Sequence, residues 1–102
     1  MIIYSVTISL DNGVEGPWLK WMKEVHIPDM MATGYFVEHS IHKLLEPVIE
    51  PDQVSYNIWY ILDSLEQLDA YRNGPAKALQ EDHQAKFGDR YIAIRSVLDK
   101  IS

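Results

Sequence analysis

Two stretches of the chain alternate between apolar and polar residues, and they restrict the fold more than any other feature. In residues 2–10 and 54–62 every second residue is apolar or aromatic, and serine, threonine or asparagine occupies most positions between. This period of two is typical of strands with one face in a core. Residues 90–98 alternate similarly, and we expect Ile92, Ile94 and Leu98 on one face and Arg95 on the other.

Between the first two strand-like stretches the pattern becomes that of an amphipathic helix. From Trp18 to His26, the apolar and aromatic residues fall within an arc of about 160° when residues are placed 100° apart, and His26 lies inside that arc. Pro17 suits the first position of a helix. Pro28 disfavours helical geometry at Ile27, so the sequence predicts that the helix ends there.

A second helical region is predicted between residues 64 and 88. Residues 64–67 have the spacing of a capping box, Asn73-Gly74-Pro75 interrupts the helix, and Gly88 is placed to close it. One face of the second piece is formed by Ala76, Leu79, His83 and Phe87. A helix with this face would pack on the sheet.

Residues 35–46 fit a helix and a strand about equally well. Read as a strand, they complete a βαββαβ order, the ferredoxin-like split βαβ sandwich of the α+β class. We expect one domain over residues 1–102, with both helices on one face of a four-stranded antiparallel sheet. A second copy, packed sheet to sheet, would cover the other face. The residues expected on that face are Ser5, Thr7, Ser9, Ser55, Asn57, Trp59 and Arg95.

Composition excludes several classes of function. The net charge is -6 and no cluster of lysine or arginine is present, so neither nucleic acid nor a membrane surface is an expected partner. The chain has no cysteine, which excludes disulfides and thiolate chemistry. No apolar run approaches the roughly 20 residues of a membrane helix, and no signal peptide is recognisable. We therefore expect a cytoplasmic protein.

Three strings, HIPDMMATG, VSYNIWY and GPAKALQEDHQAKFGDRYIAIRSVL, resemble the signature of an uncharacterised bacterial family labelled only as a domain of unknown function. That family is similar in fold to the dimeric α/β-barrel superfamily, which includes cofactor-independent monooxygenases, haem-degrading oxygenases and stress-responsive barrels. The resemblance implies that residues 35–46 form a strand and that the protein is a homodimer through its sheet faces. It implies no established activity.

Haem is the one cofactor that the superfamily suggests. Some haem-degrading members use a helical histidine as the iron ligand, assisted by an asparagine on the first strand and a tryptophan. His83 resembles that histidine, and Trp59 is the candidate for the tryptophan. The first strand has no asparagine, and Asn57 on a neighbouring strand is a weak substitute. We therefore predict no cofactor.

The two helical histidines each have two interpretations. His83 lies on an apolar face, where it needs a polar partner. It is either a structural residue bonded to a backbone carbonyl or tyrosine, or a ligand or general base in a pocket. His26 either favours the helix dipole at a C-terminus or takes part in binding. Because the helices should run antiparallel, we expect the two histidines at opposite ends of the domain, and we predict no metal site.

Two functions follow as hypotheses. The first is binding of a small aromatic or apolar molecule between helices and sheet, with oxygenase-like chemistry at His83 as the catalytic residue. The second is a non-catalytic structural or interaction module in which both histidines are structural. A pocket that reaches His83 from solvent would favour the first.

Four further residues are candidates for ligand binding. They are His26, Trp59, Asn57 and Arg95. Arg95 could bind an anionic group, or it could pair with Glu38 within the chain or across a dimer. The sequence alone does not choose between these partners for Arg95.

Overall fold

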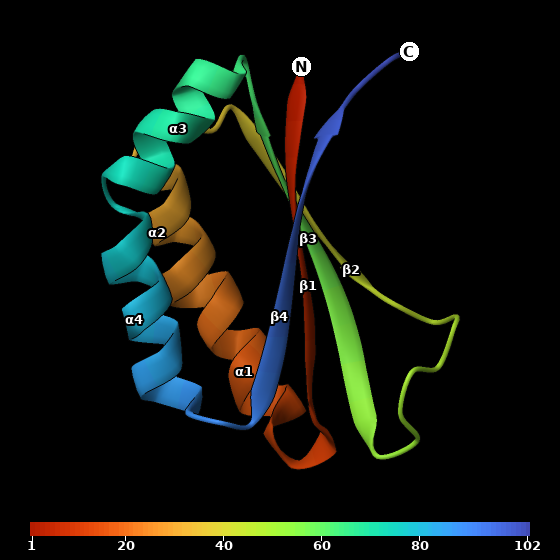
Figure 1. The fold of residues 1–102 in the computed structure, drawn as a ribbon. Helices are drawn as coiled ribbons and strands as arrows, with labels where there is room; N and C mark the ends of the chain where they lie inside the picture. The colour runs from red at the N-terminus through yellow and green to blue at the C-terminus, as the bar shows by residue number, and fades with distance from the viewer.

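The computed structural model describes all residues, 1–102. Four strands form one antiparallel sheet in the order β2-β3-β1-β4, and every helix lies on the same face of it (Figure 1). The strands are β1 (Ile2–Asp11), β2 (Glu38–Lys43), β3 (Gln53–Leu62) and β4 (Tyr91–Asp99). The helical elements are η1 (Asn12–Val14), α1 (Glu15–Trp21), η2 (Met22–His26), α2 (Ile27–Ala32), α3 (Leu65–Asn73) and α4 (Ala76–Phe87). This is the predicted ferredoxin-like α+β fold.

The core lies between the helices and the two central strands. Alternate residues of β1 and β3 point toward the helices and are buried, as the alternation predicts. Tyr4 pairs with Tyr60, and Val6 pairs with Ile58, at the middle of the sheet. Burial of these large side chains at about 25 cal/mol per Å² is the main driving force for this layer arrangement.

Residues 38–43 form strand β2, which pairs with β3 at one edge of the sheet. The strand is short and mostly exposed, which explains why its sequence has no clean period. The loop that follows carries Leu45, Val48 and Ile49, all more than half exposed. The assignment to a strand, which the family resemblance favoured, is confirmed.

The first helical region continues past the point where Pro28 was predicted to end it. Ile27 is helical, with φ -63° and ψ -44°, and its N–H bonds to the carbonyl of Met22, five residues earlier. This π-helical turn, η2, places Pro28 in the first turn of α2, where its missing N–H is tolerated. The prediction of a helix end at Ile27 is wrong, because the π-turn restarts the helix. The wider turn also rotates Val25, expected in the buried arc, to an exposed position.

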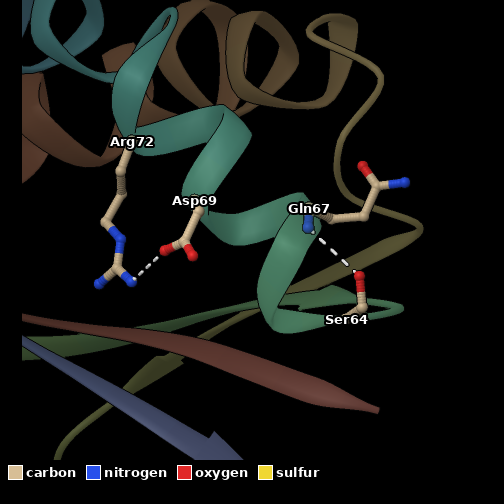
Figure 2. A network of polar contacts seen from close by, with 4 residues as sticks. All are labelled: Ser64, Gln67, Asp69 and Arg72. Atoms are coloured by element: carbon tan, nitrogen blue, oxygen red, sulfur yellow. Dashed lines mark hydrogen bonds and ion pairs between the residues drawn. The ribbon is translucent and has the colours of Figure 1, made fainter.

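The second helical region has the predicted start, break and end. Ser64 accepts a hydrogen bond from the backbone N–H of Gln67 at the start of α3, and Arg72 pairs with Asp69 one turn further (Figure 2). Gly88 ends α4 with φ +61°, a conformation that favours glycine. No helix of the structure is long and apolar enough to cross a lipid bilayer.

The faces of β4 are opposite to the prediction. Arg95 pairs with Val6 and therefore points toward the helices, while Ile94 pairs with Thr7 on the open face. Ile92 and Ile94 are 61% and 63% exposed. The prediction failed because it assigned the more apolar side of β4 to the core, whereas the uncovered face of this edge strand is the apolar one.

Candidate functional site

A small cavity lies between the helices and the sheet. Its volume is about 30 Å³, which is space for two or three water molecules at roughly 10–15 Å³ each. The lining residues are Tyr4, Val6, Ile8, Met22, His26, Met30, Ile58, Tyr60, Tyr71, Leu79, Gln80, His83, Tyr91 and Arg95. The set contains no aspartate or glutamate, so the polar groups of the wall are histidine, tyrosine, glutamine and arginine side chains.

His83 contributes a buried imidazole to this wall, with 5% of the residue exposed. The indole Nε1–H of Trp18 donates a hydrogen bond of 2.9 Å to His83 Nε2. Burial lowers the pKa of His83 to about 4, and the positive charges of His26 and Arg95 act in the same direction. The ring is therefore neutral at pH 7, and its partner is a tryptophan rather than the predicted carbonyl or tyrosine.

His26 lies beside His83, with 5.7 Å between the ring centres. His26 is the last residue of the π-turn, and its ring stacks on Trp21 with 5.1 Å between the ring centres. Burial lowers the pKa of His26, although the carboxylates of Asp29 and Asp82 oppose the shift. The expectation that the two histidines lie at opposite ends is wrong, because the first helical region runs on to Ala32 and leaves His26 in its middle.

Three tyrosines form the apolar end of the cavity. Tyr4, Tyr60 and Tyr71 pack ring to ring, and the hydroxyl of Tyr71 donates to Met30 Sδ at 3.2 Å. Burial raises the pKa of each of them, and the positive charge of Arg95 offsets part of the rise at Tyr4. These hydroxyls therefore stay protonated and can donate hydrogen bonds.

Arg95 lies where the cavity meets an open groove between α4 and β4. The groove has a volume of about 490 Å³. Gln80, Tyr91 and Arg95 line both the cavity and the groove. Arg95 is exposed and has no carboxylate within 4.0 Å. An unpaired guanidinium therefore lies at the cavity mouth, and the alternative pairing with Glu38 within the chain is not found.

Tyr91 separates His83 from the groove. Its ring lies edge-on to His83 with 4.1 Å between centres. Its hydroxyl donates to Gln84 Oε1 at 2.9 Å, which ties β4 to α4. Tyr91 lines both spaces, so it lies between His83 and the groove.

The other two candidate residues, Asn57 and Trp59, lie on the open face of the sheet. The Asn57 amide donates to the hydroxyls of Ser5 and Thr7, on the neighbouring strand. Trp59 packs edge-on against His42 and is 38% exposed. The sheet itself separates both residues from His83, so they do not belong to the cavity.

The arrangement fits neither a metal ion nor a haem. No group of three or more histidine, aspartate or glutamate side chains is placed to hold a metal ion. The cavity is far smaller than a porphyrin. The lone pair of His83 Nε2, the expected iron ligand, accepts the Trp18 hydrogen bond.

Sequence reasoning missed Trp18, the tyrosines and Tyr91 as site residues. Trp18 is on the apolar arc of the first helical region and is fully buried, but its N–H also donates a hydrogen bond to His83. The alternation does contain a signal for Tyr4 and Tyr60, because a tyrosine on the buried face of a strand brings a hydroxyl that needs a polar neighbour. No pattern in the sequence indicates the Trp18–His83 contact.

Solved structures with this fold include a dimeric ferredoxin-like protein from an uncultured marine organism, with a TM-score of 0.74 at 7% identity, covering 99% of this chain and 96% of that one. HapK from Hahella chejuensis has a TM-score of 0.72 at 12% identity, and the match covers 100% of this chain and 94% of HapK. A mutant of MhuD, with two manganese protoporphyrin IX molecules bound per active site, has a TM-score of 0.68 at 20% identity. The match covers 100% of this chain and 96% of the MhuD chain. At these identities the likeness establishes the fold alone.

Fold and neighbours together define a ferredoxin-like α+β protein. Residues 1–101 match the family described as Domain of unknown function (DUF4286), and the chain belongs to that family. A search of curated protein sequences gives no match.

Proposed function

We propose that the protein binds a small organic anion, whose oxygen-bearing end enters the cavity and whose apolar body lies in the groove beside β4. The observation that carries this proposal is the unpaired guanidinium of Arg95 at the junction of cavity and groove. A guanidinium offers a planar fork of N–H donors that matches a carboxylate.

Charge and burial at the site support an anion over a cation. The whole chain has a net charge of -6, yet the cavity wall contains no acid and one arginine. The tyrosine hydroxyl of Tyr4 lies beside Arg95 and can donate to the same ligand. Within the cavity a carboxylate would meet donors and a positive charge, whereas an ammonium would meet no negative charge. Glu81 is the one acid of the groove, and its carboxylate lies 4.0 Å from the ammonium of Lys77.

The sizes of the two spaces limit the ligand. The cavity of about 30 Å³ holds only a head group, while the groove of about 490 Å³ holds a ring or a short chain. Tyr91 and Ala93 line the groove and provide apolar contact. An aryl or short alkyl carboxylate is the class of ligand that fits both spaces.

Binding of benzoate and of uncharged benzyl alcohol, followed by shifts in amide NMR spectra, tests the proposal. We expect benzoate to bind more tightly, and Arg95→Gln to weaken benzoate binding by roughly tenfold or more while leaving benzyl alcohol nearly unchanged. Lys20→Gln removes an exposed cation from α1 and is the matched control. Equal affinities for the two compounds, or no effect of Arg95→Gln, would overturn the proposal.

Binding is proposed here in place of the oxygenase-like reaction. A general base at His83 needs a free lone pair within reach of the substrate. The lone pair of Nε2 is engaged by Trp18. A role in binding is compatible with a neutral His83 whose Nε2 accepts the Trp18 hydrogen bond.

We also propose that two copies pair through their open sheet faces. Apolar side chains border this face, and the centre is a polar network in which Ser9 bonds Ser55 and Asn57 bonds two hydroxyls. The exposed apolar residues on the face include Trp59, Ile92, Ile94 and Leu98. A patch of this kind is typical of a contact surface, and similar folds are described as dimeric.

A further inference from the structure

We propose that Trp18 is a positioning residue that fixes His83 in the tautomer with its proton on Nδ1, so that His83 presents a hydrogen-bond donor to the cavity. The tautomer does not depend on a bound ligand, whereas the selection of ligands by this donor rests on the proposed function.

The tautomer follows from the donor inventory. An indole N–H can only donate, and a neutral imidazole has one nitrogen that donates and one that accepts. Because Trp18 Nε1–H points at His83 Nε2 over 2.9 Å, Nε2 is the acceptor. The proton of the neutral ring must therefore be on Nδ1.

The second nitrogen borders open space. His83 Nδ1 makes no hydrogen bond within the protein, and no buried side-chain nitrogen or oxygen is sealed away without a partner. His83 lines the cavity, so Nδ1–H is available to a group placed there.

The packing around Trp18 fixes its indole ring in the position that favours the Nδ1–H tautomer of His83. Its side chain is fully buried and packs on Tyr56 with 5.0 Å between ring centres. The Tyr56 hydroxyl donates to the Glu15 carboxylate at 2.7 Å, and Lys43 pairs with the same carboxylate at 2.9 Å. This chain of contacts ties the indole to α1, β3 and the end of β2.

Protonation of His83 would break the arrangement. A second N–H on Nε2 would face the Trp18 N–H, donor against donor. The neighbouring positive groups, Arg95 and His26 when charged, also disfavour an imidazolium. Asp82, adjacent in α4, is exposed, and its charge acts on His26. The site therefore keeps a neutral donor and selects a ligand by an acceptor oxygen, a carboxylate or a carbonyl.

NMR of the imidazole nitrogens in the ligand-free protein tests the tautomer. The cross-peaks between ring protons and ring nitrogens distinguish the two neutral forms. We expect the wild type to show only the Nδ1–H form of His83, and Trp18→Phe to show the Nε2–H form or a mixture. Trp21→Phe is the matched control, because Trp21 packs edge-on against His83 at 5.5 Å without a hydrogen bond, and it should keep the wild-type form.

A wild-type spectrum with the Nε2–H form or a mixture would overturn the proposal, and it decides the matter even if Trp18→Phe fails to fold. A Trp18→Phe spectrum identical to the wild type would also overturn it.

Ligand selection is measured separately with acetophenone, which only accepts hydrogen bonds, and benzylammonium, which only donates them. We expect acetophenone to bind, and Trp18→Phe to weaken it roughly three- to tenfold, the range of one lost hydrogen bond. Tighter binding of benzylammonium would overturn the selection of acceptors. Failure of benzoate to bind while the tautomer is as expected would overturn the proposed function and leave the role of Trp18 intact.

Discussion

The rings of His26 and His83 lie 5.7 Å apart although they belong to helices that run in opposite directions (Figure 1). A π-helical turn ends at His26, and the first helical region continues through Pro28 beyond it. π-turns are uncommon and often occur at functional sites. A buried His83 and a half-buried His26, both with a lowered pKa and beside an unpaired arginine, are the feature that most clearly separates this cavity from ordinary core.

Acid should destabilise the protein through His83. The pKa of His83 is about 4 in the folded state against an ordinary value of 6.5, so the unfolded chain binds the proton first as pH falls. The contribution of neutral His83 to the free energy of unfolding is complete above pH 6.5 and is lost as the pH falls from 6.5 to 4. A tenfold change in proton affinity is worth about 1.4 kcal/mol, so we expect a loss of about 2–3 kcal/mol in the free energy of unfolding, measured with urea.

Variants assign this pH dependence to one residue. His83→Gln keeps an acceptor for Trp18 and removes the titration, so its unfolding free energy should change less over the same range. His39→Gln, at an exposed histidine, should follow the wild type. Identical pH profiles for wild type and His83→Gln would contradict the assignment.

Gly88 should not tolerate a side chain. Its φ of +61° and ψ of -128° at the end of α4 put a Cβ in a strained conformation, so Gly88→Ala should lower the free energy of unfolding by about 1–3 kcal/mol. Gly13→Ala, with open space and no positive φ, should cost less than half as much. Equal losses in thermal or urea unfolding would show that the backbone strain is absent.

The hydroxyls of Tyr56 and Tyr60 should contribute differently to the free energy of unfolding. The Tyr56 hydroxyl donates to the Glu15 carboxylate, and burial together with this bond raises the pKa of Tyr56 to about 12. Tyr56→Phe should cost about 1–2 kcal/mol of unfolding free energy. Tyr60→Phe should be nearly neutral, because the Tyr60 hydroxyl has no partner in the protein and borders the cavity. A larger loss of unfolding free energy for Tyr60→Phe than for Tyr56→Phe would contradict this prediction.

The open sheet face should govern self-association. Ile94→Lys places a charge at the centre of the exposed apolar residues of β4 and should convert a dimer into a monomer in light scattering after size exclusion. Leu65→Lys changes an equally apolar and 54% exposed residue on α3 and should leave the dimer intact. A wild-type monomer, or a dimer that survives Ile94→Lys, would exclude pairing through this face.

The parts of the fold that the sequence predicts are those governed by local chemistry. The alternation in β1 and β3, the Ser64 cap and the Gly88 end each depend on neighbours within a few residues, and all three are confirmed. The face predicted for Arg95 is wrong because the more apolar side of β4 is the uncovered one, so the alternation points to the opposite face.

The site depends on contacts between distant segments. The π-turn at Met22–His26 is not encoded by a recognised motif, and the helical region continues beyond it to Ala32, which leaves His26 in the middle of that region beside His83. The bond from Trp18 to His83 joins the first and last helices. A sequence can indicate that His83 needs a partner, but the packing of the two helices decides which residue provides it.

The position of bound benzoate tests the central claim most directly. Intermolecular NOEs between the benzoate ring protons and assigned side chains report which face of the sheet the ligand contacts. The account predicts NOEs to Tyr91 and Ala93 in the groove. NOEs confined to Trp59 and Ile94, on the open face of the sheet, would contradict it.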